Sequence, residues 1–357
     1  MVNHTTRCVV LAGGGTAGHI EPALAVGEVL RDEFGVEVAA LGTEKGLETA
    51  IVPARGFPLR LIDPVPIPRG KPWLLPGVPL KLARSVSQTR AALKQTHAGA
   101  VFGTGGYVAA SAYLAAASLR IPFFVLETNA LAGLANKLGV WLGGTGFNAV
   151  AGSGMAGEVL GIPVRPGVGR DPDGSKAAHG YKMWGLDPNC PTILITGGSQ
   201  GAASINAAVG ASISELASRG WQVLHAYGRK NDAPAPHERY TAVPYIDEME
   251  AALAVADVVV CRSGAMTVAE NSAAGLPAIY VPLPHGNGEQ GLNCAHLVEA
   301  GAAVRIDDAE LTPGRLVEEL DAILATPGRL DEMRAALDVS GAGDVSRELA
   351  SRVAAAL

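Results

Sequence analysis

The sequence of 357 residues lacks the residue spacings that mark disulfide frameworks, zinc sites and redox centres. Its four cysteines, Cys8, Cys190, Cys261 and Cys294, lie far apart and form no C-x-x-C pair, so we expect buried, reduced thiols. The eight histidines show no ligand spacing such as H-x-x-x-H, and we expect no bound metal and no cofactor. The apolar run at residues 1–11 is too short for a signal peptide, which favours a cytoplasmic protein.

Charged residues are also scarce, at 17% of the chain, and acids outnumber bases by 34 to 28. A disordered chain is excluded, because 48% of the residues are hydrophobic and can bury a sizeable core. The net charge of −6 argues against nucleic acid as a partner. At roughly 150 residues per domain, the length suggests two domains.

Residues 98–119 carry no charge and are long enough to cross a bilayer. Four glycines, Gly99, Gly103, Gly105 and Gly106, divide them into a short strand, a turn and an alanine-rich helix. Pieces this short do not match a membrane span, so we expect a soluble α/β segment here.

Apolar runs that end in glycine turns alternate with helical patterns, which predicts an α/β fold with parallel sheets. The expected strands of the first half are 7–11, 36–41, 100–102 and 122–126, and those of the second half are 192–196, 221–226, 258–261 and 278–281. Two doubly wound halves, each opening with a strand and a glycine turn, imply a cleft that both glycine loops face.

We expect the first domain at residues 1–165 and the second at 166–343. Residues 166–191 are rich in glycine, proline and charge, which indicates a linker. After a break at Gly341 and Gly343, the last helix, within 344–357, could pack back on the first domain.

The first glycine turn has the spacing G-x-G-x-x-G at Gly13, Gly15 and Gly18, directly after a strand. Alone this is a weak sign of dinucleotide binding, because the acid that would bind a ribose after the second strand arrives late, at Glu44. A nicotinamide or flavin enzyme is therefore an alternative. His19 lies at the following helix start, where the dipole favours a neutral base, although a solvated histidine explains the position equally well.

The second glycine turn, 197–201, presents backbone amides, a hydroxyl and a side-chain amide at a helix start. That arrangement suits an anion, and a purely structural tight turn is the alternative.

Residues 257–270 are the most informative stretch, because a strand breaks at Ser263 and a helix follows whose first amides are free for a diphosphate. Thr267 and Glu270 lie on one helix face, where a carboxylate can accept hydrogen bonds from both hydroxyls of a ribose. A capping box that starts at Ser263 would need an acid at Met266, so that structural explanation fails.

Two polar stretches receive different interpretations. The loop 284–293 contains amides that suit sugar hydroxyls, because an amide donates and accepts at once, but the side chains could equally face water. The D-x-D at 171–173, which holds a metal in some sugar-nucleotide enzymes, lies in the expected linker, so we interpret it as a turn.

The stretch from 51 to 97 contains eight bases and one acid, unlike the rest of the chain. Within it, residues 69–86 place Trp73 and several leucines and valines among basic residues and three prolines. Core packing is the simple explanation, but prolines make a buried helix awkward, and this pattern suits an anionic membrane surface.

Six stretches together resemble the MurG-type transferases of peptidoglycan synthesis, and the likeness runs nearly end to end. In chain order they are GGGTAGHIEPALA, GTGGYVAASAYLAA, ETNALAGLANK, GGSQGAASIN, DVVVCRSGAMTVAENSAAGLPAIYVPLPH and EQGLNCAHL. These enzymes add GlcNAc to undecaprenyl-pyrophosphoryl-MurNAc-pentapeptide (lipid I) to give lipid II. The family fold is GT-B, with two Rossmann-like domains and a cleft, which agrees with the two halves expected here.

The resemblance implies an acceptor- and membrane-facing first domain, a UDP-GlcNAc-binding second domain and a set of site residues. The implied substrate-binding residues are Thr16, Ala17, Gly18, Asn129, Arg165, Ser199, Ile246, Ala265, Met266, Thr267, Val268, Ala269, Glu270 and Gln290. Ile246 would meet the uracil through its backbone, 265–270 would hold diphosphate and ribose, and Gln290 would bind the GlcNAc hydroxyls. His19 is the first candidate for the base, and Glu127 is the second.

The chain departs from the family pattern in two places. Leu126-Glu127-Thr128-Asn129 stands where the family often has His-Glu-Gln-Asn, which weakens any role for the first and third positions and leaves Glu127 and Asn129. Glu289 stands where some members have Gln, which puts a sugar contact there in doubt.

The resemblance implies an inverting displacement without a metal, in which the 4-hydroxyl of MurNAc attacks the anomeric carbon of UDP-GlcNAc. The expected partners are UDP-GlcNAc, lipid I and an anionic membrane surface. The protein would work peripherally at the cytoplasmic face of the cell membrane, in cell-wall biogenesis, cell shape and cell division. A GT-B transferase with a different lipid acceptor, a UDP-GlcNAc epimerase and a non-enzymatic nucleotide-sugar binder also fit parts of the sequence.

Overall fold

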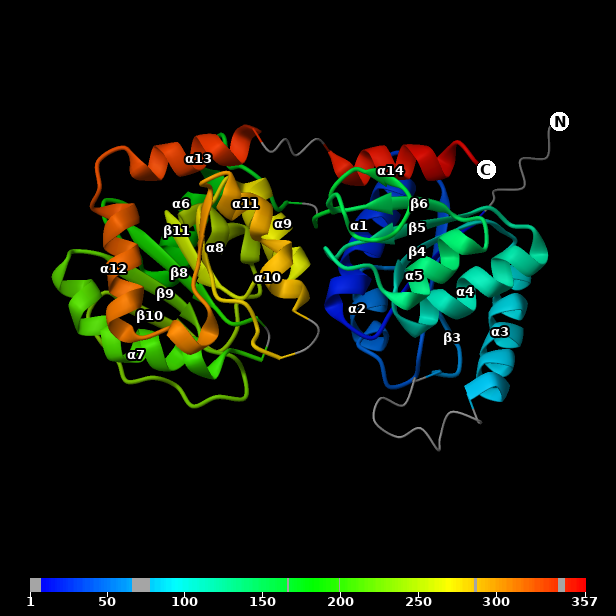
Figure 1. Cartoon of the computed structure of the whole chain (residues 1–357), viewed down its shortest axis with the longest axis horizontal. Coiled ribbons are helices and arrows are strands. Elements are labelled where there is room, and N and C mark those ends of the chain that lie inside the picture. The colour runs from blue at the N-terminus through cyan, green and yellow to red at the C-terminus, as the bar shows by residue number, and fades with distance from the viewer. Residues whose placement is uncertain (1–7, 66–77, 166, 199, 286–287, 340–343) are drawn as a thin grey trace. The chain divides into compact units, whose positions relative to one another are not determined.

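The computed structural model describes residues 8–65, 78–165, 167–198, 200–285, 288–339 and 344–357 (Figure 1). The chain divides into two compact units. Unit 1 comprises Met1–Pro166 and Asp344–Leu357, and unit 2 comprises Gly167–Gly343. The domain roles expected from the sequence stay predictions.

Unit 1 is built on a seven-stranded sheet with the order β3-β2-β1-β4-β5-β6-β7, in which all neighbours are parallel. Its strands are β1 (Cys8–Gly13), β2 (Glu37–Gly42), β3 (Leu59–Leu61), β4 (Ala98–Gly105), β5 (Phe123–Glu127), β6 (Thr145–Asn148) and β7 (Glu158–Val159). Its helices are α1 (Ala17–Asp32), α2 (Glu48–Ala54), α3 (Val78–Gln95), α4 (Gly106–Leu119), α5 (Leu134–Trp141) and α14 (Val345–Ala354).

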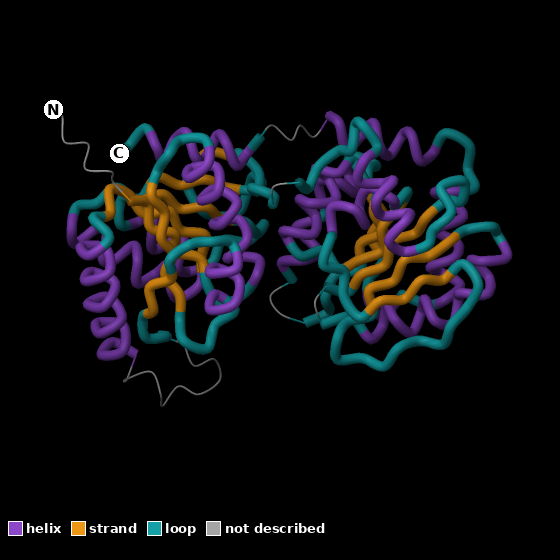
Figure 2. The backbone as a smooth tube through the Cα atoms, turned by 180° about the vertical axis from the view of Figure 1, so that it is seen from behind, coloured by secondary structure: helices purple, strands orange, loops and turns teal. Residues whose placement is uncertain are grey.

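Helices cover both faces of this sheet, as the strand sequences require (Figure 2). The central strands are apolar at consecutive positions, so their alternating side chains enter two different cores. Val9 and Leu11 of β1 pack with α1 and α14, whereas Cys8 and Val10 pack with α3 and α4. The segment 98–119 forms the predicted strand, turn and alanine-rich helix, as β4 and α4.

The C-terminal helix α14 belongs to unit 1 although the whole of unit 2 precedes it in sequence. Leu349, Ala350 and Val353 are fully buried in the same core as Ile20 and Leu24 of α1. On the surface, Arg347 of α14 forms an ion pair of 2.9 Å with Glu33, the residue that follows α1.

Unit 2 repeats the plan with a six-stranded parallel sheet of order β10-β9-β8-β11-β12-β13. Its strands are β8 (Thr192–Thr196), β9 (Gln222–Ala226), β10 (Tyr240–Val243), β11 (Val258–Cys261), β12 (Ala278–Tyr280) and β13 (Ala303–Arg305). Its helices are α6 (Ser175–Trp184), α7 (Ala203–Ser218), α8 (Met249–Val255), α9 (Ala265–Ala274), α10 (Glu289–Asn293), α11 (Ala295–Glu299), the 3₁₀ helix η2 (Asp308–Glu310), α12 (Pro313–Leu324) and α13 (Arg329–Val339).

The predicted pair of doubly wound α/β domains is therefore confirmed. In unit 1 the strand order reverses between β1 and β4, and in unit 2 between β8 and β11. The loops beyond such a switch point diverge to opposite faces of the sheet and leave room for a ligand. Both predicted glycine turns lie at these points, since they follow β1 and β8.

The prediction that 166–191 is a linker was wrong. These residues include helix α6, whose Ala177, Tyr181 and Trp184 pack on the core of unit 2. Two of the glycines that suggested a linker mark the ends of this helix, because Gly174 and Gly185 both adopt left-handed backbone conformations.

The predicted reduced cysteines are present as free thiols: Cys8, Cys261 and Cys294 are buried, and Cys190 is half-buried. Burial raises the pKa of Cys8 to about 11 and that of Cys261 to about 12, so both stay protonated at neutral pH.

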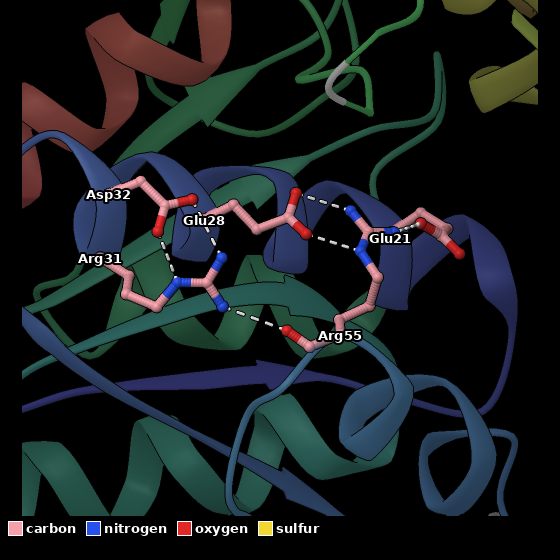
Figure 3. A network of polar contacts seen from close by, with 5 residues as sticks. All are labelled: Glu21, Glu28, Arg31, Asp32 and Arg55. Carbon is pink, nitrogen blue, oxygen red and sulfur yellow. Dashed lines mark hydrogen bonds and ion pairs between the residues drawn. The ribbon is translucent and has the colours of Figure 1, made fainter.

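A network of ion pairs fixes α2 against α1 (Figure 3). Arg55, which follows α2, lies 2.6 Å from Glu28 and 3.0 Å from Glu21, two acids of α1. These three side chains are mostly buried, and the pKa of the Arg55 guanidinium is raised, chiefly by the hydrogen bond to Glu28. Arg31 of α1 adds a hydrogen bond to the Arg55 carbonyl oxygen.

We expect the stability of unit 2 to fall as the pH drops from 6.5 to 4, because of His225 in β9. Its ring is buried between Tyr240 Oη at 2.6 Å and Asn206 Oδ1 at 3.1 Å, and burial lowers its pKa from 6.5 to about 4. The unfolded chain takes up a proton in this range and the folded one does not, so stability present above pH 6.5 is lost by about 3 kcal/mol at pH 4.

Hydrogen exchange of β8 and β9 amides, corrected for intrinsic rates, measures this loss. The variant His225→Gln removes the titrating group, so its exchange profile should be flatter than that of the unsubstituted protein. Equal slopes in the two proteins would show that His225 does not carry the effect.

Candidate active site

The first glycine loop of unit 1 depends on backbone approaches that leave no space for side chains. A Cβ atom at Gly13 would lie 2.3 Å from the carbonyl oxygen of His19 and from Thr104 Oγ1. A Cβ atom at Gly106, where φ is +80°, would lie 2.5 Å from the carbonyl oxygen of Gly14. The loop is therefore held closely between α1 and the start of α4.

His19 lies in the first turn of α1, half-buried, and its ring packs over Gly105. Its Nδ1 atom is 3.3 Å from the carbonyl oxygen of Gly14 and 3.3 Å from Thr16 Oγ1. A hydrogen bond to the Gly14 carbonyl oxygen, which can only accept, requires the proton on Nδ1, whereas Thr16 Oγ1 can donate or accept and fits either tautomer. In that tautomer Nε2 carries the lone pair and can take a proton.

Glu48, the first residue of α2, is a fully buried carboxylate beside the same loop. Its Oε1 accepts a hydrogen bond of 2.7 Å from the Gly15 backbone amide. Among the described residues, its Oε2 has no hydrogen-bond partner.

Glu127 ends β5 and is also buried, but its carboxylate is fully engaged. Oε1 accepts from the backbone and side-chain amides of Asn129, and Oε2 accepts from Gly133 N and Asn136 Nδ2, each at 2.9–3.3 Å. Asn136 in turn accepts from the buried Tyr113 hydroxyl at 3.0 Å. With four donors around its two oxygens, this carboxylate is suited to hold the loop that carries Asn129.

The other predicted residues of unit 1 come from three segments. Thr16 and Ala17 are exposed at the N-terminus of α1, and Gly18 is half-buried beside them, so the structure brings these three together with His19 in one turn. Asn129 is half-buried in the loop after β5. Arg165 is half-buried near the point where the chain leaves unit 1 for unit 2.

In unit 2 the loop between β11 and α9 is fixed by Arg262. Its guanidinium donates to the carbonyl oxygens of Val281 and Pro282 and to Ser204 Oγ, and it pairs with Asp308. Asn293, at the end of α10, donates at 3.2 Å to the carbonyl oxygen of Ser263. This loop, and with it the start of α9, is therefore tied to four different segments of the unit.

Helix α9 divides the predicted stretch 265–270 into two sets. Ala265 and Val268 are buried, and Val268 packs in the core, so their side chains do not face solvent. Met266, Thr267, Ala269 and Glu270 are half-buried on the outer side. The amide of Val268 donates to the Gly264 carbonyl oxygen, whereas the amides of 265–267 precede the first intrahelical bond and can meet an anion.

The second glycine loop follows β8 and approaches the end of β9. A Cβ atom at Gly201 would lie 2.2 Å from the Tyr227 carbonyl oxygen, and Asn231 Nδ2 donates to the carbonyl oxygens of Gln200 and Tyr227. Ser199, the predicted anion ligand of this loop, lies outside the described residues.

The remaining predicted residues of unit 2 are Gln290, in helix α10, and Ile246, in the loop after β10. Gln290 of α10 accepts a hydrogen bond of 3.0 Å from Leu283 N through Oε1, so its NH₂ group is the end that can meet a sugar oxygen. Ile246 is buried in the core after β10, which leaves only its backbone for a ligand. Beside it, Arg229 stacks 4.2 Å from the ring centroid of the half-exposed Tyr245.

The D-x-D at 171–173 forms the predicted turn. Asp171 accepts from the amides of Lys176 and Ala177, and Asp173 accepts from Ser175 N and Oγ, which caps the start of α6. Among the described residues, no cluster of three or more His, Cys, Asp or Glu side chains has the arrangement of a metal site.

Sequence reasoning missed Glu48 and Asn136, which contact loops of unit 1, and Arg262, which fixes the β11–α9 loop of unit 2. Arg262 gave the clearest signal, because a single charge directly after a buried apolar strand needs partners at that position. Asn136 and its partner Glu127 both lie in the quoted stretch ETNALAGLANK, whereas Glu48 and its partner Gly15 lie in segments that have no sequence motif in common.

Comparison with known proteins shows the family. The glycosyltransferase family 28 N-terminal domain matches residues 9–143, and the glycosyltransferase family 28 C-terminal domain matches residues 192–349. A Corynebacterium efficiens protein named UDP-N-acetylglucosamine--N-acetylmuramyl-(pentapeptide) pyrophosphoryl-undecaprenol N-acetylglucosamine transferase is 57% identical, over 98% of this chain and 97% of its own. A Mycobacterium protein of the same name is 47% identical, over 97% and 94%.

Solved structures agree. Acinetobacter baumannii MurG superposes with a TM-score of 0.77 at 27% identity, over 97% of this chain and 99% of its own. The calicheamicin glycosyltransferase CalG4 shares the fold, with a TM-score of 0.69 at 18% identity, over 99% and 98%. The GT-B fold is thereby confirmed, and the chain, a hexosyltransferase, belongs to glycosyltransferase family 28 and to its MurG-type N-acetylglucosaminyltransferases.

Proposed function

We propose that this enzyme transfers GlcNAc from UDP-GlcNAc to the 4-hydroxyl of MurNAc in lipid I, giving lipid II, with inversion at the anomeric carbon. The observation that carries the acceptor and donor is the 57% identity, over nearly both full lengths, to a protein named for that reaction. The hydroxyl oxygen forms the new bond to the anomeric carbon while the bond to the UDP oxygen breaks. The hydroxyl proton passes to a base of unit 1.

His19 is the base in this proposal. Its support is geometric, because the Gly14 carbonyl oxygen occupies Nδ1 and leaves the lone pair on Nε2. Glu127 is a weaker candidate, since four donors already surround its two oxygens. We assign to Glu127 the positioning of Asn129.

Unit 2 supplies the donor site in this proposal. The amides of 265–267 at the start of α9 are placed to receive the diphosphate, and they would stabilise its growing charge as UDP leaves. Glu270, one turn further along the outer side, would accept the ribose hydroxyls. Gln290 would donate to a GlcNAc hydroxyl.

Replacing His19 with Ala should lower kcat by about 10²- to 10⁴-fold, because proton transfer to a placed base contributes that much. The measurement is transfer of labelled GlcNAc from UDP-GlcNAc to a lipid I analogue, with UDP-GlcNAc affinity followed by calorimetry. UDP-GlcNAc binding should be unchanged, and the control His179→Ala, at an exposed site on α6, should keep full activity. A fully active His19→Ala enzyme would exclude His19 as the base, and transfer to diacylglycerol in place of lipid I would overturn the acceptor.

Replacing Glu270 with Ala should weaken UDP binding by about 10- to 100-fold, because two hydrogen bonds from ribose to a carboxylate are lost. Titration calorimetry with UDP measures the change. The control Glu318→Ala removes an exposed carboxylate from α12 and should bind UDP normally. Unchanged affinity in Glu270→Ala would refute the ribose role.

We also propose that helix α3 binds peripherally to an anionic membrane, at the cytoplasmic face. Leu80 is 79% exposed, and the neighbouring Lys81 and Arg84 are exposed as well, whereas Leu93 at the other end of the helix is buried. Trp73 and the rest of 69–77 lie outside the described residues. In the part of the chain that the structure describes, no helix combines the length and hydrophobicity that a bilayer crossing needs.

The variant Leu80→Glu should bind vesicles of phosphatidylcholine and phosphatidylglycerol about tenfold more weakly, because a leucine that enters the bilayer contributes about 1.5–3 kcal/mol. Vesicle sedimentation measures binding. Met183→Glu, which makes the same kind of change at an exposed site of unit 2, is the control. Equal binding by both variants would place the contact elsewhere.

A further inference from the structure

Two groups of unit 1 contact the same peptide bond from opposite sides. The carbonyl oxygen of Gly14 and the amide N–H of Gly15 belong to one peptide group. The oxygen lies 3.3 Å from His19 Nδ1, and the N–H donates a hydrogen bond of 2.7 Å to Glu48 Oε1. The Glu48 carboxylate, the Gly14–Gly15 peptide and the His19 imidazole are thus linked in that order by two hydrogen bonds.

We propose that Glu48 is a positioning residue that acts on His19 through the Gly14–Gly15 peptide, holding the imidazole in the tautomer with its lone pair on Nε2 and stabilising the proton that it receives. The proposal rests on the role of His19 proposed above. A negative charge at the N–H end of a peptide makes its carbonyl oxygen a stronger acceptor, since hydrogen bonds in a chain polarise one another. The stronger acceptor favours the proton on Nδ1.

The surroundings of Glu48 concentrate its charge on this one peptide. The side chain is fully buried, and no ion pair to it occurs among the described residues. Oε2 has no hydrogen-bond partner there, so the Gly15 amide is the one donor that the described structure gives the carboxylate. Burial of a carboxylate with a single donor costs stability, which a purely structural role would not require.

The local sequence makes room for this carboxylate at three glycines. A Cβ atom would lie 2.4 Å from Oε1 at Gly14, 1.6 Å from Oε2 at Gly46 and 2.7 Å from the Glu48 Cβ at Gly42. The far end of α2 is anchored separately by the ion pairs of Arg55 with α1. Helix α2 therefore holds the carboxylate against the loop, and the ion pairs that anchor α2 are made with α1 and not with the loop.

The test compares Glu48→Gln, which keeps an acceptor for Gly15 and removes the charge, with Glu44→Gln. Glu44 is an exposed acid in the same β2–α2 connection, so the control makes the same charge change without the contact. Nitrogen-15 spectra of the His19 ring, assigned by His19→Ala, should show hydrogen on Nδ1 in the unsubstituted protein and in Glu44→Gln. The Nδ1–H fraction should fall in Glu48→Gln.

In transfer assays, Glu48→Gln should lower kcat by about tenfold or more, with the affinity for UDP-GlcNAc unchanged. In the His19→Ala background the same change should lower kcat by less than about twofold, because coupled residues are not additive. An equal loss in both backgrounds, or activity equal to that of Glu44→Gln, would overturn the proposal.

The ring spectrum separates this proposal from the role of His19 in catalysis. If His19→Ala stays active, the base assignment fails, but a fall of the Nδ1–H fraction in Glu48→Gln still supports the Glu48–peptide–His19 path. If Glu48→Gln does not fold, the nitrogen-15 spectrum of the His19 ring in the unsubstituted protein tests the proposal by itself. A His19 ring with its hydrogen on Nε2 in that protein overturns the proposal.

Discussion

The close approach of backbone segments around the first glycine loop is the constraint on which the site of unit 1 depends. Gly13 and Gly106 let the loop lie against α1 and α4 with no side chain between them. That approach places the Gly14 carbonyl oxygen within reach of His19 and the Gly15 amide within reach of Glu48. Any side chain at these positions would separate the groups, because the space it needs is occupied by backbone and by buried polar atoms.

The two units share one topology but prepare their strand ends for different chemistry. In unit 1, the buried groups behind the switch-point loops are carboxylates and amides, which hydrogen-bond to the loops next to His19 and Asn129. In unit 2, Arg262 ties the β11–α9 loop to neighbouring segments, and the amides at the start of α9 are left for an anion. This difference supports the proposal that unit 1 activates the acceptor hydroxyl and unit 2 holds the nucleotide diphosphate.

The sequence predicted the central strands and both glycine turns, because buried parallel strands are continuous apolar runs that end in glycine. β8 and β11 have the expected bounds. The four edge strands β3, β7, β10 and β13, and β6 beside β7, were missed, since two to four residues that are mostly only partly buried carry no such pattern. Helix α6 was missed because its apolar face is weak, and the glycines that flank it are also typical of a linker. Glu48 was missed because its partner lies 33 residues away, on another element.

Two buried carboxylates of unit 1, Glu127 at the end of β5 and Glu48 at the start of α2, differ in the number of hydrogen-bond donors around them. Glu127 accepts four hydrogen bonds, all from residues of the loop that follows it and from α5. Its carboxylate therefore fixes Asn129 and the start of α5. Glu48 has one donor in the described structure, and that donor is a peptide whose other end faces the imidazole. A carboxylate that accepts hydrogen bonds from several local amides makes its loop rigid. A carboxylate with a single donor polarises that donor, because hydrogen bonds in a chain polarise one another. In the proposal, the same residue type therefore fixes a loop after β5 and polarises a peptide from the start of α2.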